Sequence, residues 1–247
     1  MNNFDLEKLI NEKLSSHQFD DIVPNGLQIE GRSTVKKIIT GVTACQDLLN
    51  KALYYNVDAI IVHHGYFWKN ESRYIHNMQK ERLKTILIND INLYSWHLPL
   101  DAHKKLGNNA QIAKKLNISI KGNILPYVFW GTMDNKITSD ELVERIKNKF
   151  QITPIHLYQN APSYIHRIAW CSGRGQNFIK QAYKLGIDAF LTGEISEETM
   201  HIAKELGIHF FSLGHHITEK DGIKSLGNWL KAKYHLDVQF VNIHNPA

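Results

Sequence analysis

The chain has 247 residues, of which 43% are hydrophobic and 21% charged. This composition is typical of globular proteins and excludes a disordered chain. The length suits one large domain or two small ones and is sufficient for a substantial core. No run approaches the roughly 18 consecutive apolar residues that would cross a bilayer, so we expect no membrane partner.

The N-terminal residues 1–14 have the pattern of an amphipathic helix. Asp5 and Glu7 stand where a secretory signal would carry basic residues, and no unbroken apolar run follows them. The two cysteines, Cys45 and Cys171, lack the spacing of a metal site and are predicted to be free thiols in a reducing compartment. Together these features predict a soluble cytoplasmic protein.

The net charge is +5, which would also suit a phosphate-bearing partner. However, the lysines are scattered in short pairs with no long basic block, so we favour ordinary solvated surfaces. The 14 histidines are the less common feature. Histidine is the commonest metal-binding side chain, so the placement of these residues carries the functional argument.

Two segments, 38–65 and 168–195, share one pattern. Each runs from an apolar strand through a turn of small residues and a helix into a second apolar strand that opens on an Asp-Ala pair. Apolar residues recur at matching offsets in the two helices, as a helix packed on a sheet requires. A further strand follows in each half, at 91–97 and 208–215. We interpret this as an internal duplication; the alternative is chance similarity within a common pattern.

Strands that alternate with helices of about ten residues predict an α/β fold with largely parallel sheets and right-handed crossovers. A less regular stretch at 118–133 lies between the halves, and Thr138 with Glu141 forms a capping box for the next helix. We place lobe one at 1–126 and lobe two at 127–247. No long Pro- or Ser-rich linker separates them, so we expect a single domain over 1–247 with tightly packed lobes.

The reactive side chains fall where predicted strands end, which is where open α/β sheets bind ligands. A structural role alone does not explain this bias, since buried ionisable groups are costly unless they are paired or bound to metal. His63 and His64 follow the strand 58–62, and His97 to Asp101 follow the strand 91–96. In the second half, Glu194 follows the strand 188–192, and His215 to Glu219 follow the strand 208–213.

Several of these residues can bind metal. His63 and His64 stand at a strand end where they could turn toward two different ions, although one core and one surface histidine is the alternative. His215 and Glu219 are four residues apart and share a helical face. Asp101 could be a ligand or a turn residue. Three imidazoles and two carboxylates suit zinc, manganese or iron better than calcium, and a carboxylate bridging two ions is typical of hydrolytic sites.

Long motifs in order along the chain then indicate a family. They are PNGLQIEG (24–31), TGVTA (40–44), DAIIVHHGYFW (58–68), YSWHLPLD (94–101), GNNAQIA (107–113), LTGE (191–194) and GHHITEKDGI (214–223). The sequence resembles the GTP cyclohydrolase 1 type 2 homologues, also called Nif-three-like proteins, over essentially its whole length. It is similar to the compact bacterial form, which lacks an insertion between the halves.

The resemblance implies two α/β lobes with a pair of divalent metal ions between them, at the carboxyl ends of the strands. It also implies a ring-shaped homohexamer, for which the apolar segment 127–130 is candidate contact material. The metal ligands of the family map onto five residues of this chain: His63, His64, Asp101, His215 and Glu219.

Two further residues are candidates for catalysis. His97 precedes Asp101 by four residues and could carry a proton or orient that carboxylate. Glu194 occupies the repeat position of His64, so we expect it near the metals as a hydrogen-bond acceptor or proton carrier. The aromatic run 66–68 could form a wall for a planar ring, but we favour plain packing.

The function that we favour is a dinuclear-metal hydrolase. The family name implies a small-molecule substrate such as a purine nucleotide, opened by metal-activated water, although the chain has no Walker-type loop to support GTP independently. One alternative is a non-catalytic metal-binding ring that stores metal or acts as a scaffold. Another is a ring that binds nucleic acid, against which no segment interleaves basic and aromatic residues.

Overall fold

The computed structural model describes residues 1–247 and divides them into two compact units. The first unit comprises Met1–Gly107 and Gly222–His244, and the second comprises Asn108–Asp221 and Asn245–Ala247. The division therefore falls at Gly107 and not near residue 126, where the sequence placed it. The reason is that 118–133, which reads as an irregular connection, forms paired strands of the second sheet. The chain also returns to the first unit near its C-terminus.

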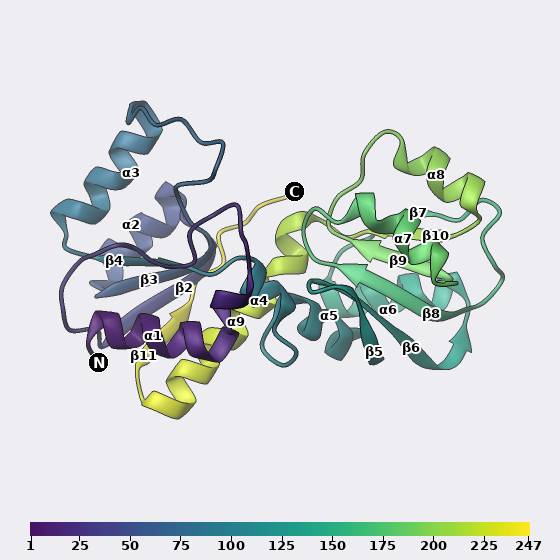
Figure 1. Ribbon diagram of the computed structural model, residues 1–247, viewed down its shortest axis with the longest axis horizontal. Helices are drawn as coiled ribbons and strands as arrows, with labels where there is room; N and C mark the ends of the chain where they lie inside the picture. The colour runs from purple at the N-terminus through teal and green to yellow at the C-terminus, as the bar shows by residue number, and fades with distance from the viewer. The chain divides into compact units, whose positions relative to one another are not determined.

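The first unit contains a five-stranded sheet in the order β1-β4-β3-β2-β11 (Figure 1). Its central strands are parallel, and only β1 runs antiparallel to its neighbour. In chain order its elements are α1 (Asn3–Leu14), a 3-10 turn (Ser16–Gln18), β1 (Gly26–Ile29), β2 (Lys37–Thr43), α2 (Gln46–Tyr55), β3 (Ala59–His64), α3 (Asn77–Ile88), β4 (Asn92–Ser95), α4 (Leu98–Ala102) and β11 (Asp237–Phe240).

Helices cover both faces of this sheet because alternate strand residues point to opposite sides. On one face, residues of α1 and of the later turns of α9 (His215–Tyr234) pack against Ile38, Ile61 and Trp96. On the other, α2 and α3 pack against Ile39 and Ile60. The first unit is thus an α/β/α sandwich, with both faces of its central strands buried.

The second unit contains a six-stranded sheet in the order β5-β6-β8-β9-β10-β7. Its centre, β8-β9-β10, is parallel, while β5, β6 and β7 add antiparallel edges that the sequence did not predict. Its elements are α5 (Asn108–Leu116), β5 (Ile118–Leu125), β6 (Val128–Ile137), α6 (Ser139–Phe150), β7 (Ile155–Leu157), β8 (Ile165–Cys171), a 3-10 turn (Gln176–Phe178), α7 (Ile179–Lys184), β9 (Ala189–Thr192), α8 (Thr199–Leu206), β10 (His209–Ser212) and the start of α9.

This sheet is also covered on both faces. Residues of α5 and α6 pack against Trp170 and Phe211 on one side, and α7 and α8 pack against Phe190 and Phe210 on the other (Figure 1). Val128 and Phe129 belong to these cores, with 0% and 3% of their surface exposed. They are therefore not free to form the contact between subunits that the sequence suggested for 127–130.

The strand register supports the internal duplication. Ile38 pairs with Ala59 in the first sheet, and Ile168 with Ala189, each 130 residues later, in the second. The aspartates that open the second strand of each repeat make matching contacts. Asp58 accepts from the backbone N–H groups of Lys36 and Lys37, and Asp188 accepts from those of His166 and Arg167. The two parallel cores are built from the same βαβ pattern.

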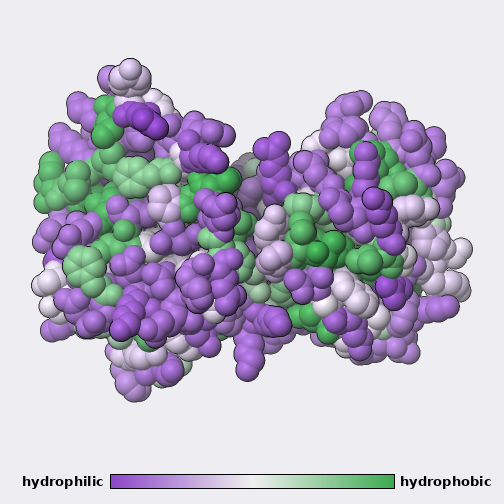
Figure 2. Space-filling view, viewed as in Figure 1, coloured by the Kyte–Doolittle hydropathy of each residue, from purple (hydrophilic) through white to green (hydrophobic).

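The helix ends follow local sequence signals. The side chain of Asn2 accepts from the backbone N–H groups of Phe4 and Asp5 and caps α1. Thr138 and Glu141 form the capping box predicted for α6. No helix in the chain has the length and apolar character needed to cross a membrane. On the face shown in Figure 2, hydrophilic residues cover most of the surface, and hydrophobic residues gather in separate patches.

Candidate metal centre

The first unit brings three histidines together at the carboxyl ends of its central strands. His63 and His64 end β3, and His97 follows β4. One ring nitrogen from each of the three histidines lies within 4.8 Å of those from the other two. Asp101, in the short helix α4, places its Oδ1 atom 3.6 Å from Nε2 of His63. His63 is fully buried and Asp101 is 6% exposed, which is an expensive location for ionisable groups without a specific role.

The Nδ1 atoms of the first two histidines face neighbours of the same unit. Nδ1 of His63 lies 2.9 Å from the carbonyl oxygen of Trp96. Nδ1 of His64 lies 3.4 Å from the hydroxyl of Thr43. A hydrogen bond at Nδ1 fixes the ring orientation and leaves Nε2 as the atom that can bind a metal.

His97 is held by a buried carboxylate that the sequence did not single out. Its Nδ1 lies 2.8 Å from Oδ1 of Asp21, whose side chain is 2% exposed. The other Asp21 oxygen accepts from the side chain of Asn25 and from the backbone N–H of Leu98. Burial raises the pKa of Asp21, but the hydrogen bond and charge of His97, with these further donors, lower it overall. Asp21 is therefore an ionised anchor for the ring of His97.

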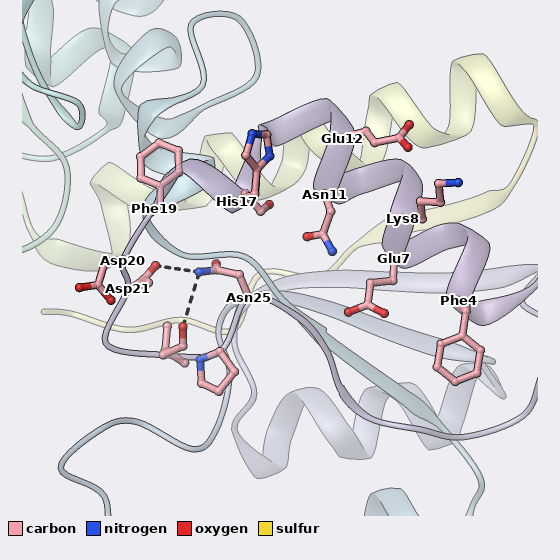
Figure 3. A pocket seen from close by; sticks show the side chains of 13 residues that line it. Phe4, Glu7, Lys8, Asn11, Glu12, His17, Phe19, Asp20, Asp21 and Asn25 are labelled. Carbon is pink, nitrogen blue, oxygen red and sulfur yellow. Dashed lines mark hydrogen bonds between the residues drawn. The ribbon is translucent and has the colours of Figure 1, made fainter.

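A pocket of the first unit adjoins this anchor. Its volume is about 890 Å³, and it lies between α1 and the segment 16–25 (Figure 3). Asp21 and Asn25 form part of its wall, joined to each other by a hydrogen bond. None of the five predicted metal ligands lines it. The pocket therefore borders the support of His97 and not the ligands themselves.

The second unit supplies a histidine flanked by two carboxylates. His215 begins α9, and its Nε2 lies 3.0 Å from Oε2 of Glu219, one helical turn later. Its Nδ1 lies 2.6 Å from Oε1 of Glu194, in the loop after β9. Burial lowers the pKa of His215, but the hydrogen bonds and charges of Glu219 and Glu194 outweigh it and raise the pKa to about 9. Both ring nitrogens therefore face acceptors.

Gly173 leaves room beside this pair. It has a φ of +60°, and a Cβ atom there would lie 3.0 Å from Nε2 of His215 and still closer to Oε1 of Glu219. A glycine is needed both for the left-handed backbone and for the open space. The second unit thus keeps free the volume into which its two candidate ligands point.

The donor sets of both units fit divalent transition metals. Imidazole nitrogens and carboxylate oxygens are the ligands that zinc, manganese and iron share. The Nδ1 atoms of His63, His64 and His215 each have a partner within their own unit. Such partners are the usual support of metal-binding histidines. The residues present therefore suit divalent metal ions.

Comparison with known proteins identifies the family. The sequence matches the family described as Duf34/NIF3 (NGG1p interacting factor 3) over residues 1–246. The chain belongs to this family. The GTP cyclohydrolase 1 type 2 homolog of Buchnera aphidicola subsp. Schizaphis graminum is 74% identical over 247 residues, which cover 100% of both chains.

Solved structures of Duf34/NIF3 relatives have the same fold over the full length. The structure of protein ybgI has a TM-score of 0.98 at 53% identity, with 100% of both chains covered. TTHA1606 from Thermus thermophilus has a TM-score of 0.92 at 30% identity, again with 100% of both chains covered. The family resemblance and the two-lobed α/β fold predicted from the sequence are confirmed.

The structure places the predicted residues of this Duf34/NIF3 protein in two groups. His63, His64, His97 and Asp101 lie together in the first unit, and Glu194, His215 and Glu219 lie together in the second. Oε1 of Glu194 lies 2.6 Å from Nδ1 of His215, and its role at a metal site stays a prediction.

Sequence reasoning missed several supporting groups. Asp21 lies 76 positions before His97, so no local pattern links the two residues. Thr43 and the Trp96 carbonyl act through geometry that only the sheet provides. Gly173 had a usable signal, because the turn after the apolar strand 165–171 contains two glycines.

Proposed function

We propose that this protein is a metal-dependent hydrolase that uses two divalent ions. The main support is the orientation of the three candidate histidine ligands. Each has its Nδ1 beside a hydrogen-bonding partner of its own unit, and in His63 and His215 the Nε2 atom faces a candidate carboxylate ligand. A histidine that merely fills a core needs neither arrangement.

In this proposal the five ligands serve two ions of zinc, manganese or iron. His63, His64, Asp101, His215 and Glu219 would hold these ions. When bound, such ions supply Lewis acidity and lower the pKa of water toward 7, which provides a nucleophile at neutral pH.

Two residues of the chain support the chemistry. Asp21 holds His97 through Nδ1, which leaves Nε2 to accept a proton from water or return one to a leaving group. Glu194 holds His215, so we assign to it the orientation of that ligand in preference to proton transfer.

The substrate class comes from the relatives, which bear the name GTP cyclohydrolase 1 type 2 homolog. We propose a purine nucleotide. In the reaction, the oxygen of water adds to the imidazole-ring carbon, a ring C–N bond breaks, and the ring nitrogen takes up the proton. The product is heavier than GTP by one water molecule and requires no oxidant or reductant.

The test is turnover by protein of confirmed metal content. Protein loaded in turn with zinc, manganese and iron is incubated with GTP, and the product is identified by mass. We expect the hydrated, ring-opened nucleotide with at least one metal. If no nucleotide is turned over while two ions are bound, the hydrolase is rejected in favour of a non-catalytic metal-binding scaffold.

The role of His97 is tested by His97→Asn, which keeps size and hydrogen bonding but cannot titrate near neutrality. A group that transfers protons typically contributes about 10²–10⁴-fold to the rate. We therefore expect a loss in this range with metal content retained. A variant as active as wild type would leave the hydrolase in place but remove His97 from proton transfer.

A further inference from the structure

The segment that follows the paired histidines is held by hydrogen bonds to Gln28 and Glu71. Gln28 donates to the carbonyl oxygen of Tyr66 and accepts from its backbone N–H. The carboxylate of Glu71 accepts from the N–H groups of Phe67 and Trp68, at 2.7 and 3.1 Å. These bonds hold a turn that begins directly after Gly65.

The turn contains a strained residue. Phe67 has a φ of +65°, in the left-handed region that a bulky side chain rarely adopts. Its side chain is also exposed, at 43%, so burial does not compensate for the conformation. Strain of this kind persists where the surroundings enforce it, and it clusters at functional sites.

The turn places the ring of Trp68 beside the histidines. The indole centroid lies 5.7 Å from the ring of His64 and 5.1 Å from that of His97. The interplanar angles are 57° and 75°, so neither imidazole lies flat on the indole. The indole N–H donates to the carbonyl oxygen of Gly65, which fixes the ring, and the residue is only half-buried.

From these observations we propose that Trp68 is a stacking surface for a planar heteroaromatic ring bound beside the metal ligands. A fixed indole gives a large flat contact at little entropic cost, and bases stack well on such rings. The plain packing favoured from the sequence describes Tyr66, which is 5% exposed with its hydroxyl bonded to Ala44. It does not explain the half-buried Trp68 or the strained turn that holds it.

This inference rests on the proposed function only for its choice of a nucleotide, so its test uses binding and not turnover. Calorimetry compares GTP with inorganic triphosphate, which shares the phosphate chain but has no ring, on full-length zinc-loaded protein. We expect GTP to bind at least about tenfold more tightly than triphosphate. Trp68→Leu should remove most of this difference and leave triphosphate binding unchanged.

Two further variants complete the comparison. Trp68→Phe retains an aromatic ring and should keep most of the GTP affinity. Trp130→Leu is the matched control, because Trp130 is also half-buried but lies in the second unit with the Arg167 guanidinium 4.9 Å from its ring. It should bind GTP like wild type. If Trp68→Leu also does so, or if GTP binds no better than triphosphate, the stacking surface is rejected.

Tryptophan fluorescence gives a second readout in case Trp68→Leu loses metal or folds poorly. GTP should quench the emission of wild type, and the quenching should largely disappear in Trp68→Phe although that variant still binds. Unchanged quenching in Trp68→Phe would reject the proposal. Quenching at Trp68 without turnover would support the stacking surface and reject the hydrolase, whereas turnover with no effect of Trp68→Leu would do the reverse.

Discussion

Single hydrogen bonds fix the orientation of the candidate metal ligands. Glu194 and Glu219 lie on opposite sides of the His215 ring, at Nδ1 and Nε2. Only the Nε2 side faces a candidate ligand, while the Nδ1 side faces a carboxylate from another loop. Such a partner orients the imidazole and increases its basicity, which strengthens metal binding.

Glu194→Gln should therefore weaken metal binding by about 10–100-fold without unfolding the protein. The amide remains able to accept from Nδ1, but it lacks the charge. The measurement is zinc affinity by competition with a chelator. Glu197→Gln is the control, because Glu197 is also acidic and in the same loop, but its side chain is 87% exposed. Equal affinities for both variants would show that Glu194 does not support the metal site.

Another pair of histidines acts on stability instead. Nε2 of His156, in β7, lies 3.1 Å from Nδ1 of His209, in β10, and His156 stacks on Phe211 at 4.3 Å. Burial and the neighbouring His209 lower the pKa of His156 to about 4, although Asp140 opposes this. Burial also lowers the pKa of His209, against the opposing hydrogen bond of Pro162 and the charge of Asp188.

These pKa shifts predict that the paired strands β7 and β10 lose stability in acid. In the unfolded chain the His156 side chain has its ordinary pKa of 6.5, whereas in the folded protein its pKa is about 4. The unfolded state therefore binds more protons in this window, and stability is lost as pH falls through it. Each kcal/mol lost lowers Tm by about 2–4 °C in a chain of this size.

The measurement is Tm between pH 7 and 4.5. His156→Gln should show a shallower fall in Tm than wild type, because one of the two titrating groups is gone. His201→Gln is the control, since the His201 side chain is 65% exposed on α8. If the Tm values of wild type and His156→Gln fall in parallel as the pH is lowered, the acid sensitivity belongs to other groups.

Elements were predictable where their signals are local. The repeat, the capping box of α6 and the strand-end histidines all depend on neighbours in sequence. The hairpin of β5 and β6 could not be predicted, because β5 is largely exposed and the strand pairing is interrupted by bulges. The anchor at Asp21 was missed for a different reason, since its partner His97 is adjacent only after the first sheet has formed.

At the scale of the whole molecule, the family resemblance predicts a homohexameric ring. The mass in solution, measured by light scattering at micromolar concentration, should be six times the 28.5 kDa of one chain. The contact surface should not include Val128 or Phe129, because both are buried within the second unit. A stable species of 28.5 kDa would reject the ring.

The central proposal is that His63, His64, Asp101, His215 and Glu219 together hold a pair of metal ions. The most direct measurement is elemental analysis of gently purified wild type, His63→Ala and Glu219→Ala, with circular dichroism to confirm the fold. We predict about two ions per wild-type chain and a large loss in each variant, although the two residues belong to different units. Metal content that is unchanged in both folded variants would contradict the claim.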